Sequence, residues 1–323
     1  MAQRLDALTA DGHWGATAKW GFASTRTGAI SVKLFSFKIM FWVLLPISVV
    51  SYSALMVWMS FKPPYPQVLK EPGKPQGYAT VHMIAGLMSA QMDSFGGWLP
   101  NDLTLTPGAA QDNLPNFQLG VLQVVRHSAR VLRDNLSRQR TSDAVHRETD
   151  QAHTAYNNDP FKWAFPSAEN AFKRGNSALR RFASELGGSA NVYPRADNLI
   201  ELLKIFISEL GTVSTRLLEA QDSGKVSWFE IDDNFYFAQG VGFAMYGMML
   251  AVREDFKGVL TDKNALKITD LIVNSLKSSQ FEPWLITNGA KNGFLANHSN
   301  NLKVFLDDAR QKLKSLESIL DQG

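Results

Sequence analysis

The chain has 323 residues, of which 45% are hydrophobic and 20% charged, with no cysteine and a formal net charge of +3. This length holds one large or two small domains, and the composition excludes a disordered chain and a membrane protein built of many spans. The lack of cysteine excludes disulfides, thiolate metal sites and cysteine nucleophiles, and leaves the redox compartment open.

The excess positive charge belongs to the N-terminal part of the chain. Residues 1–75 hold eight of the 33 basic residues and three of the 30 acidic ones, so residues 76–323 carry 25 basic against 27 acidic residues. A nucleic-acid-binding domain concentrates basic residues on its surface. The distribution gives no support to a nucleic-acid partner, and we expect none.

The first strong pattern is an uncharged run of 23 residues, 39–61, which follows a tail (1–38) rich in small residues that we expect to be flexible. At about 1.5 Å per residue the run gives roughly 34 Å of helix, enough to cross a hydrocarbon core of about 30 Å. Trp42 and Trp58 lie near its ends, where aromatic rings favour the membrane interface. A signal peptide would have a shorter apolar core and a small-residue cleavage site, so we predict a single retained transmembrane helix in the bilayer.

The charges that flank this run set the expected orientation. Four basic residues precede it without a nearby acid, Lys19, Arg26, Lys33 and Lys38, and three follow it, Lys62, Lys70 and Lys74. The side richer in lysine and arginine stays in the cytoplasm. We therefore expect an inner-membrane protein with a cytoplasmic N-terminus and a periplasmic C-terminal domain.

Residues 62–76 contain five prolines, at positions 63, 64, 66, 72 and 75. Such spacing favours an extended, polyproline-like chain. We predict a spacer that holds the following domain away from the bilayer.

From residue 77 to 323 the pattern is helical. Apolar residues recur at intervals of three and four, and no convincing strand alternation appears, which predicts an all-α domain of many helices. Ser167 is a candidate N-cap and Gly187–Gly188 a candidate stop for the helix between them. We expect helices at 79–93, 118–140, 143–156, 168–186, 196–220, 262–278 and 299–321.

The run 235–252 is 18 residues without a charge and could be a second span. Acidic and basic residues bracket it closely, and Gln239 and three glycines dilute it. A helix that is apolar on all sides also suits the centre of a helical domain. We predict a buried core helix.

Arg126, Arg130 and Arg133 share one face of the helix at 118–140. They could bind lipid headgroups or an acidic partner, or they could form a solvated face paired with neighbouring helices, which is the commoner case. The histidines lack metal-ligand spacing, so no metal site is predicted, and no cofactor motif is present.

Glu230, Asp232 and Asp233 form a carboxylate cluster, and the tryptophans at 98, 163, 228 and 284 lie in expected loops or near helix ends. Paired carboxylates beside aromatic rings are what a glycan-cleaving site needs. Acidic residues before an apolar helix also complement its dipole, and we favour that structural role. The three carboxylates remain weak catalytic candidates.

Several polar strings resemble a proteobacterial membrane-protein family catalogued as domain of unknown function 2333. They are DNLPNF (112–117), LRDNLSRQRTSD (132–143), FPSAE (165–169), YPRADNL (193–199), DDNFYFAQG (232–240) and ANHS (296–299). The resemblance covers nearly all of the chain from residue 76 onward, with Pro194 as a departure from a more usual alanine. It implies one N-terminal span and a helical domain, and no activity, cofactor or catalytic residue.

If these strings converge in the fold, a ligand site becomes more plausible than a scaffold surface. The candidate binding residues, in addition to the three arginines, are Asn113, Arg195, Asp197, Asn198, Asn297 and His298. Our leading hypothesis is an interaction or accessory component of an envelope assembly, with a protein partner there. The alternatives are an envelope enzyme acting on glycan or lipid, and a lipid-binding helical domain.

Overall fold

The computed structural model describes the chain from Arg26, with side chains from Met40. The described residues are 26–65, 67–69, 73–102, 106, 111, 113–140, 142–219, 228–283, 286–287 and 296–322, with the side chains of 228–229 left out. The tail up to residue 25, the side chain of Trp228 and all of Trp284 therefore lie outside the described part. The chain divides into two units, with the boundary after Ser51.

The described residues contain helices and no strand, which confirms the all-α fold class. The helices are α1 (Arg26–Met59), α2 (Tyr78–Asp93), α3 (Asn113–Val131), α4 (Arg147–Tyr156), α5 (Ala168–Glu185), α6 (Ala196–Glu219), α7 (Trp228–Asp255), α8 (Lys257–Asp262), α9 (Leu266–Ser278) and α10 (His298–Asp321). A 3₁₀ turn, η1 (Leu99–Asn101), precedes α3, and a π-helical turn, η3 (Leu132–Leu136), continues it.

The apolar part of α1, Met40–Met59, is long and apolar enough to cross a membrane. Its side chains are largely exposed, and none of the window is buried within the protein. The helix begins at Arg26, so residues 26–38, expected in the flexible tail, are helical.

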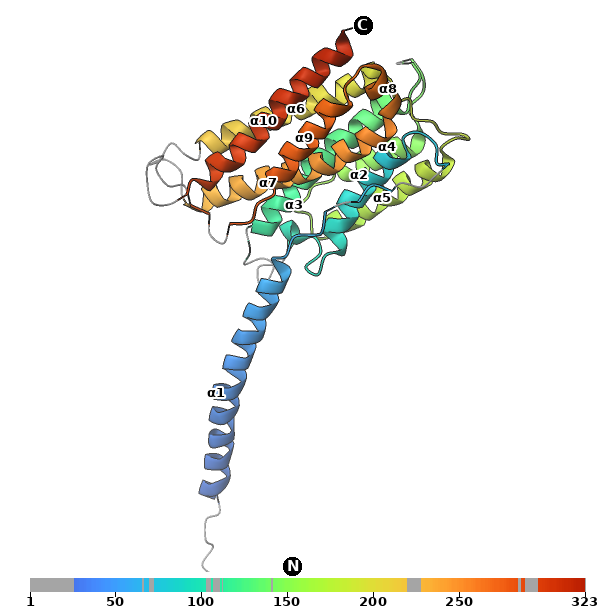
Figure 1. Cartoon of the computed structure of the whole chain (residues 1–323). Helices are drawn as coiled ribbons and strands as arrows, with labels where there is room; N and C mark the ends of the chain where they lie inside the picture. Colours follow the sequence, from blue (N-terminus) through green and yellow to red (C-terminus); the bar gives the residue numbers. More distant parts are fainter. Residues whose placement is uncertain are drawn as a thin grey trace, which may run out of the picture. The chain divides into compact units, whose positions relative to one another are not determined.

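Helix α7 forms the centre of the helical domain. It contacts α2, α3, α6 and α9, while α10 covers α6 and α9, and α4 with α5 forms a hairpin against α2 and α3 (Figure 1). The segment Glu230–Asp255 is also long and apolar enough for a span, but 78% of it is buried in the domain. The prediction of a core helix at 235–252 is confirmed.

Two glycines let α7 approach α3 at backbone distance. A Cβ added at Gly240 would lie 2.0 Å from the carbonyl oxygen of Phe117, and one added at Gly120 would lie 2.2 Å from that of Phe237. Only glycine fits where two helix backbones come this close. This close contact sets the position of Phe117 in α3 relative to residues 237–240 of α7.

The expected signals around α5 are confirmed. The side chain of Ser167 accepts a hydrogen bond from the backbone N–H of Asn170, and Gly187 follows the helix with a φ of 82°. A hydroxyl cap satisfies one of the free amides of the first turn, and glycine adopts the left-handed conformation at low cost.

The described residues after α1, 62–65, 67–69 and 73–76, lie on the domain, and we call them the strap. Pro63 is buried, Val68 packs on the core, and the Tyr65 ring lies 5.6 Å from Phe243 and 5.5 Å from Tyr246. These described residues contact the helical domain, and the expected separation of domain and bilayer stays a prediction. Proline-rich composition favours an extended chain, and an extended chain can equally follow a helix groove.

The strap meets α7 at several points. Lys62 donates to Gln239, Tyr65 packs on Phe243 and Tyr246, and Leu69 lines a cavity with Asp255. These described contacts lie in chain order along α7, from its middle to its end.

Candidate functional site

The most unusual site of the domain is a lysine buried in an aromatic and amide cage. The ammonium of Lys62 lies 5.4 Å from the ring centre of Phe117 and 5.1 Å from that of Tyr236. It donates a hydrogen bond to Oε1 of Gln239 and lies 3.8 Å from the carboxylate of Glu282. The Lys62 side chain is 16% exposed. We call these five residues the Lys62 cluster.

Burial dominates the electrostatics of this cluster. Desolvation lowers the pKa of Lys62 to about 8, and the attraction of Glu282 opposes it only in part. Glu282 is 74% exposed, so water screens its charge. Aromatic faces attract a cation but do not replace its hydration shell. The chain therefore holds a costly charge at the point where the strap begins.

Gln239 is fixed by the backbone around it. Its amide nitrogen donates to the carbonyl of Phe281 at 2.6 Å, which leaves its oxygen directed at Lys62. The side chain of Gln280 donates to the Gln239 carbonyl at 3.2 Å. The polar residue that diluted the apolar run thus joins the strap, α7 and the segment after α9.

A second candidate site is a polar cavity of about 300 Å³ between the end of η3 and the start of α6. We call it the arginine cavity. Its lining residues are Asp134, Asn135, Arg138, Gln139, Arg140, Arg195, Asp197 and Asn198. It therefore contains three of the candidate binding residues and joins two of the strings that carry the family resemblance.

Hydrogen bonds organise this cavity. The Arg195 guanidinium pairs with Asp197 and donates to the carbonyl of Gln139 at 3.0 Å. Asn198 donates to the carbonyl of Tyr193 at 2.8 Å, and the Tyr193 amide donates to Leu136 at 2.8 Å. Three arginines against two aspartates suit an anionic or mixed-charge partner group.

The family strings do not converge on one site. Asn113 and the arginine cavity lie at opposite ends of α3 and η3, roughly 30 Å apart along the helix. Near the first end, Asn116 donates to Asp233 at 2.6 Å, and the Phe281 ring lies 5.8 Å from Phe235. The strings at 112–117 and 232–240 thus meet at the Lys62 cluster, and those at 132–143 and 193–199 meet at the arginine cavity.

Asn297 and His298 hold the start of α10. Asn297 caps the helix by accepting from the Asn300 amide at 2.8 Å, and Nδ1 of His298 accepts from the Thr287 amide at 3.0 Å. The His298 ring lies 6.4 Å from Phe281, which places it beside the Lys62 cluster. The described contacts of Asn297 and His298 stabilise the start of α10.

The arginine stripe of α3 divides into different roles. Arg126 donates to the carbonyls of Tyr156 and Asn158 at 2.8 and 2.7 Å, so it satisfies the end of α4, and burial lowers its pKa. Arg133 pairs with Asp134 and Asp150, whereas Arg130 is exposed. Two of the three therefore join neighbouring elements.

The candidate catalytic carboxylates lie in the first turns of α7. Asp232 is 5% exposed, Asp233 accepts from Asn116, and Glu230 is on the surface. None of the three lines a described cavity. Within the described residues, no cluster of three side chains suitable for a metal is found.

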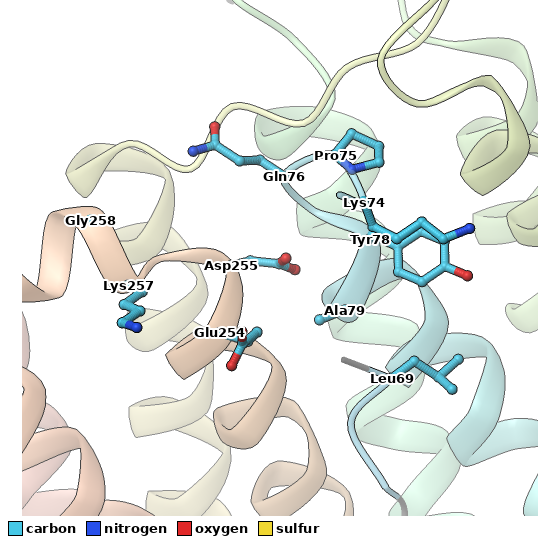
Figure 2. A pocket seen from close by; sticks show the side chains of 10 residues that line it. All are labelled: Leu69, Lys74, Pro75, Gln76, Tyr78, Ala79, Glu254, Asp255, Lys257 and Gly258. Atoms are coloured by element: carbon cyan, nitrogen blue, oxygen red, sulfur yellow. The ribbon is translucent and has the colours of Figure 1, made fainter. Parts of the chain in front are cut away.

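A cavity of about 370 Å³ lies at the far end of the strap, where α7 ends and α2 begins (Figure 2). Asp255 points from α7 to the first turn of α2 and accepts from the amide and hydroxyl of Thr80, both at 2.6 Å. Burial raises the pKa of Asp255. This carboxylate caps α2 from another helix, because Gly77 at the N-cap has no side chain to do so.

Sequence reasoning missed Lys62 and Asp255 as important residues. Lys62 was counted with the positive flank of the span, and Asp255 with the charges that close the apolar run. The available signal for Lys62 was its place between an apolar run and two prolines, where a buried lysine is costly. No local pattern could pair it with Gln239, because 177 residues separate them.

The comparisons with known proteins identify a family and no activity. A family model described as "Uncharacterized protein conserved in bacteria (DUF2333)" matches residues 37–226 and 218–323. No curated protein and no solved structure matches the chain.

Proposed function

The chain belongs to the DUF2333 family of uncharacterised bacterial proteins, and we propose that it is a single-pass inner-membrane protein whose helical domain serves as an interaction component of an envelope assembly. The helix Met40–Met59 is the anchor, and the domain lies on the periplasmic side. The more basic flank before the span supports this direction.

The observation that carries the proposal is the locked strap. Lys62 lies three residues after Met59, where the apolar helix ends, and enters the domain, where Phe117, Tyr236 and Gln239 surround it. A domain on a loose linker would search a large volume. Here the described strap residues are instead packed on the helical domain, as suits a component that presents fixed surfaces to a partner.

The arginine cavity is the surface we assign to the partner. It combines three guanidinium groups, two carboxylates and three side-chain amides, which suits recognition of a polar protein segment. The enzyme alternative requires a cleft around Glu230, Asp232 or Asp233, and no described cavity supplies one. The lipid-binding alternative requires space around 235–252, where glycines at 120 and 240 bring backbones into contact.

Two measurements on the full chain test this proposal. A reporter that is active only outside the cytoplasm, fused after Gly323, should be active, and the protein should stay in the membrane fraction after a carbonate wash. A photo-crosslinking amino acid at position 140, in the arginine cavity, should give a discrete adduct in living cells. The same group at position 257, also exposed, serves as the matched control.

An inactive reporter would reverse the proposed orientation. Adducts of equal pattern at positions 140 and 257, or adducts of the chain with itself alone, would contradict the partner surface.

A further inference from the structure

The loop between α4 and α5 exposes three aromatic side chains within five residues. Phe161, Trp163 and Phe165 are 59%, 66% and 94% exposed. Single exposed apolar residues are ordinary, but a contiguous group marks a surface that meets a partner or a membrane. We call these three residues the aromatic tip.

Hydrogen bonds hold the backbone of this loop in one shape. The buried Trp98 donates from Nε1 to the carbonyl of Pro160 at 2.8 Å, and Asn101 donates to the carbonyl of Lys162 at 3.0 Å. The Ala168 amide donates to the same Lys162 carbonyl at 2.7 Å. The exposure of the rings is therefore a property of a fixed loop and not of a slack one.

The segment that holds this loop, residues 95–101, also contacts the end of the apolar helix. The ring of Trp58 stacks on Phe95 at 4.4 Å with an interplanar angle of 7°. Phe95 is itself 57% exposed and lies three residues before Trp98, which holds the loop. A continuous set of contacts thus joins Trp58, in the last turn of the apolar helix, to the aromatic tip.

We propose that the aromatic tip inserts into the interface between lipid headgroups and acyl chains, as a second membrane contact of the chain. The proposal rests on the proposed function, since it takes Met40–Met59 as the span. Tryptophan at the end of a span marks the level of the interface, and amphipathic rings favour that layer. Phe95, which stacks on Trp58, and the loop that Trp98 holds add further exposed rings.

The charges around the tip indicate which lipids it needs. Lys162, Lys173 and Arg174 are exposed, while Asp159 is exposed and Glu169 half-buried. The basic and acidic groups nearly balance. The contact is therefore carried by the rings, and it should persist in bilayers of zwitterionic lipid alone.

The absence of cysteine gives a direct experiment. Single cysteines replace Lys162 in the tip, Val50 in the anchor and Lys257 at the start of α8, each in the full-length protein. Each carries a fluorescent label, and the protein is reconstituted in phosphatidylcholine vesicles containing lipids with a quencher near the headgroup or deep in the acyl chain. Lys162→Cys keeps all three rings, and Lys257→Cys is its matched control at another exposed lysine.

The label at 162 should be quenched by the shallow quencher, the label at 50 by the deep one, and the label at 257 by neither. Adding Phe161→Ser, Trp163→Ser and Phe165→Ser should remove most quenching at 162 while the helical circular dichroism stays unchanged, because these side chains are exposed.

If the label at position 162 is quenched no more than the label at position 257, while the label at position 50 is still quenched, the proposed membrane contact of the tip is wrong and the anchor stands. Quenching at 162 without quenching at 50 would support the tip and contradict the anchor. Loss of quenching at both would contradict both. Protection of the 162 label by a co-purified protein in place of lipid would assign the surface to that protein and overturn the proposal.

Discussion

The two apolar helices of this chain satisfy the same requirements of length and composition and meet opposite surroundings. None of the Met40–Met59 window is buried in the protein, against 78% of Glu230–Asp255. In α7, Gly240 admits the backbone of α3, and Gln239 finds partners for its amide. An apolar run therefore predicts only that a helix is removed from water. The glycines and polar residues within the run indicate whether the helix is buried in protein.

The largest effect should come from placing an arginine in each helix. Val241 is fully buried, so Val241→Arg places a charge in the core of the domain. We expect this to lower the free energy of unfolding by about 5 kcal/mol. Val50→Arg should cost about 3 kcal/mol of membrane insertion and leave the domain folded. Proteolysis measures the folding of the domain, and membrane fractionation measures insertion. Identical results for both variants would contradict the different surroundings of the two helices.

The close approach of α3 and α7 predicts the next effect. Gly240→Ala places a Cβ 2.0 Å from the Phe117 carbonyl oxygen, so the helices must separate, at a cost of about 3 kcal/mol. Gly86→Ala in α2 is the matched control, since its Cβ would meet nothing within 4 Å. That change should stabilise the protein by up to about 1 kcal/mol. Thermal unfolding followed by circular dichroism should separate the two variants; equal melting temperatures would refute the tight contact.

The strap, which follows α1 in the chain and contacts α7 through Lys62, predicts a pH dependence of stability. The native pKa of Lys62, about 8, lies below its ordinary value of 10.5. Between these values the unfolded chain holds a proton that the native state lacks, so the free energy of unfolding rises with pH across this window, by up to about 3 kcal/mol. Urea unfolding from pH 7 to 9.5 should show the first part of this rise, with a flat region below pH 8.

Lys62→Met should abolish that rise, and Lys257→Met, on the surface, should retain it. A slope that is the same in both variants would show that another group is responsible.

The smallest effect belongs to the middle of the strap. Tyr65 packs on Phe243 and Tyr246 but is 44% exposed, so Tyr65→Ala should cost about 1 kcal/mol. Tyr65→Phe should be close to neutral and serves as the control. Hydrogen exchange of the strap amides should accelerate in the alanine variant alone; unchanged exchange would mean that Tyr65 does not hold the strap.

Much of the fold followed from local sequence patterns. The cap at Ser167, the stop at Gly187 and the buried central helix all depend on residues close in the chain, where spacing and side-chain chemistry decide the result. The π-helical turn at Leu132–Leu136 was not expected, and 118–140 was read as one helix. The carbonyl of Leu136, at the end of this turn, accepts a hydrogen bond from the amide of Tyr193, which lies far along the sequence.

The sites could be predicted only in part. Arg195, Asp197 and Asn198 were selected from the sequence and do share a cavity, because they lie within four residues of one another. Their meeting with Arg138 and Arg140 needed the fold. Lys62 shows the wider limit, since its partners Phe117, Tyr236 and Gln239 come from distant parts of the chain and no spacing connects them.

The length of chain between the strap and its groove has a consequence for biosynthesis. Lys62 and Gln239 are 177 residues apart, so the strap is made long before the helix that receives it. At about 5–20 residues per second, the ribosome needs roughly ten to thirty-five seconds to make that stretch. During this interval Lys62 can keep its water and the prolines keep the segment extended and poor at pairing with other chains. The strap therefore reaches its final contacts only after α7 has been made, long after its own synthesis.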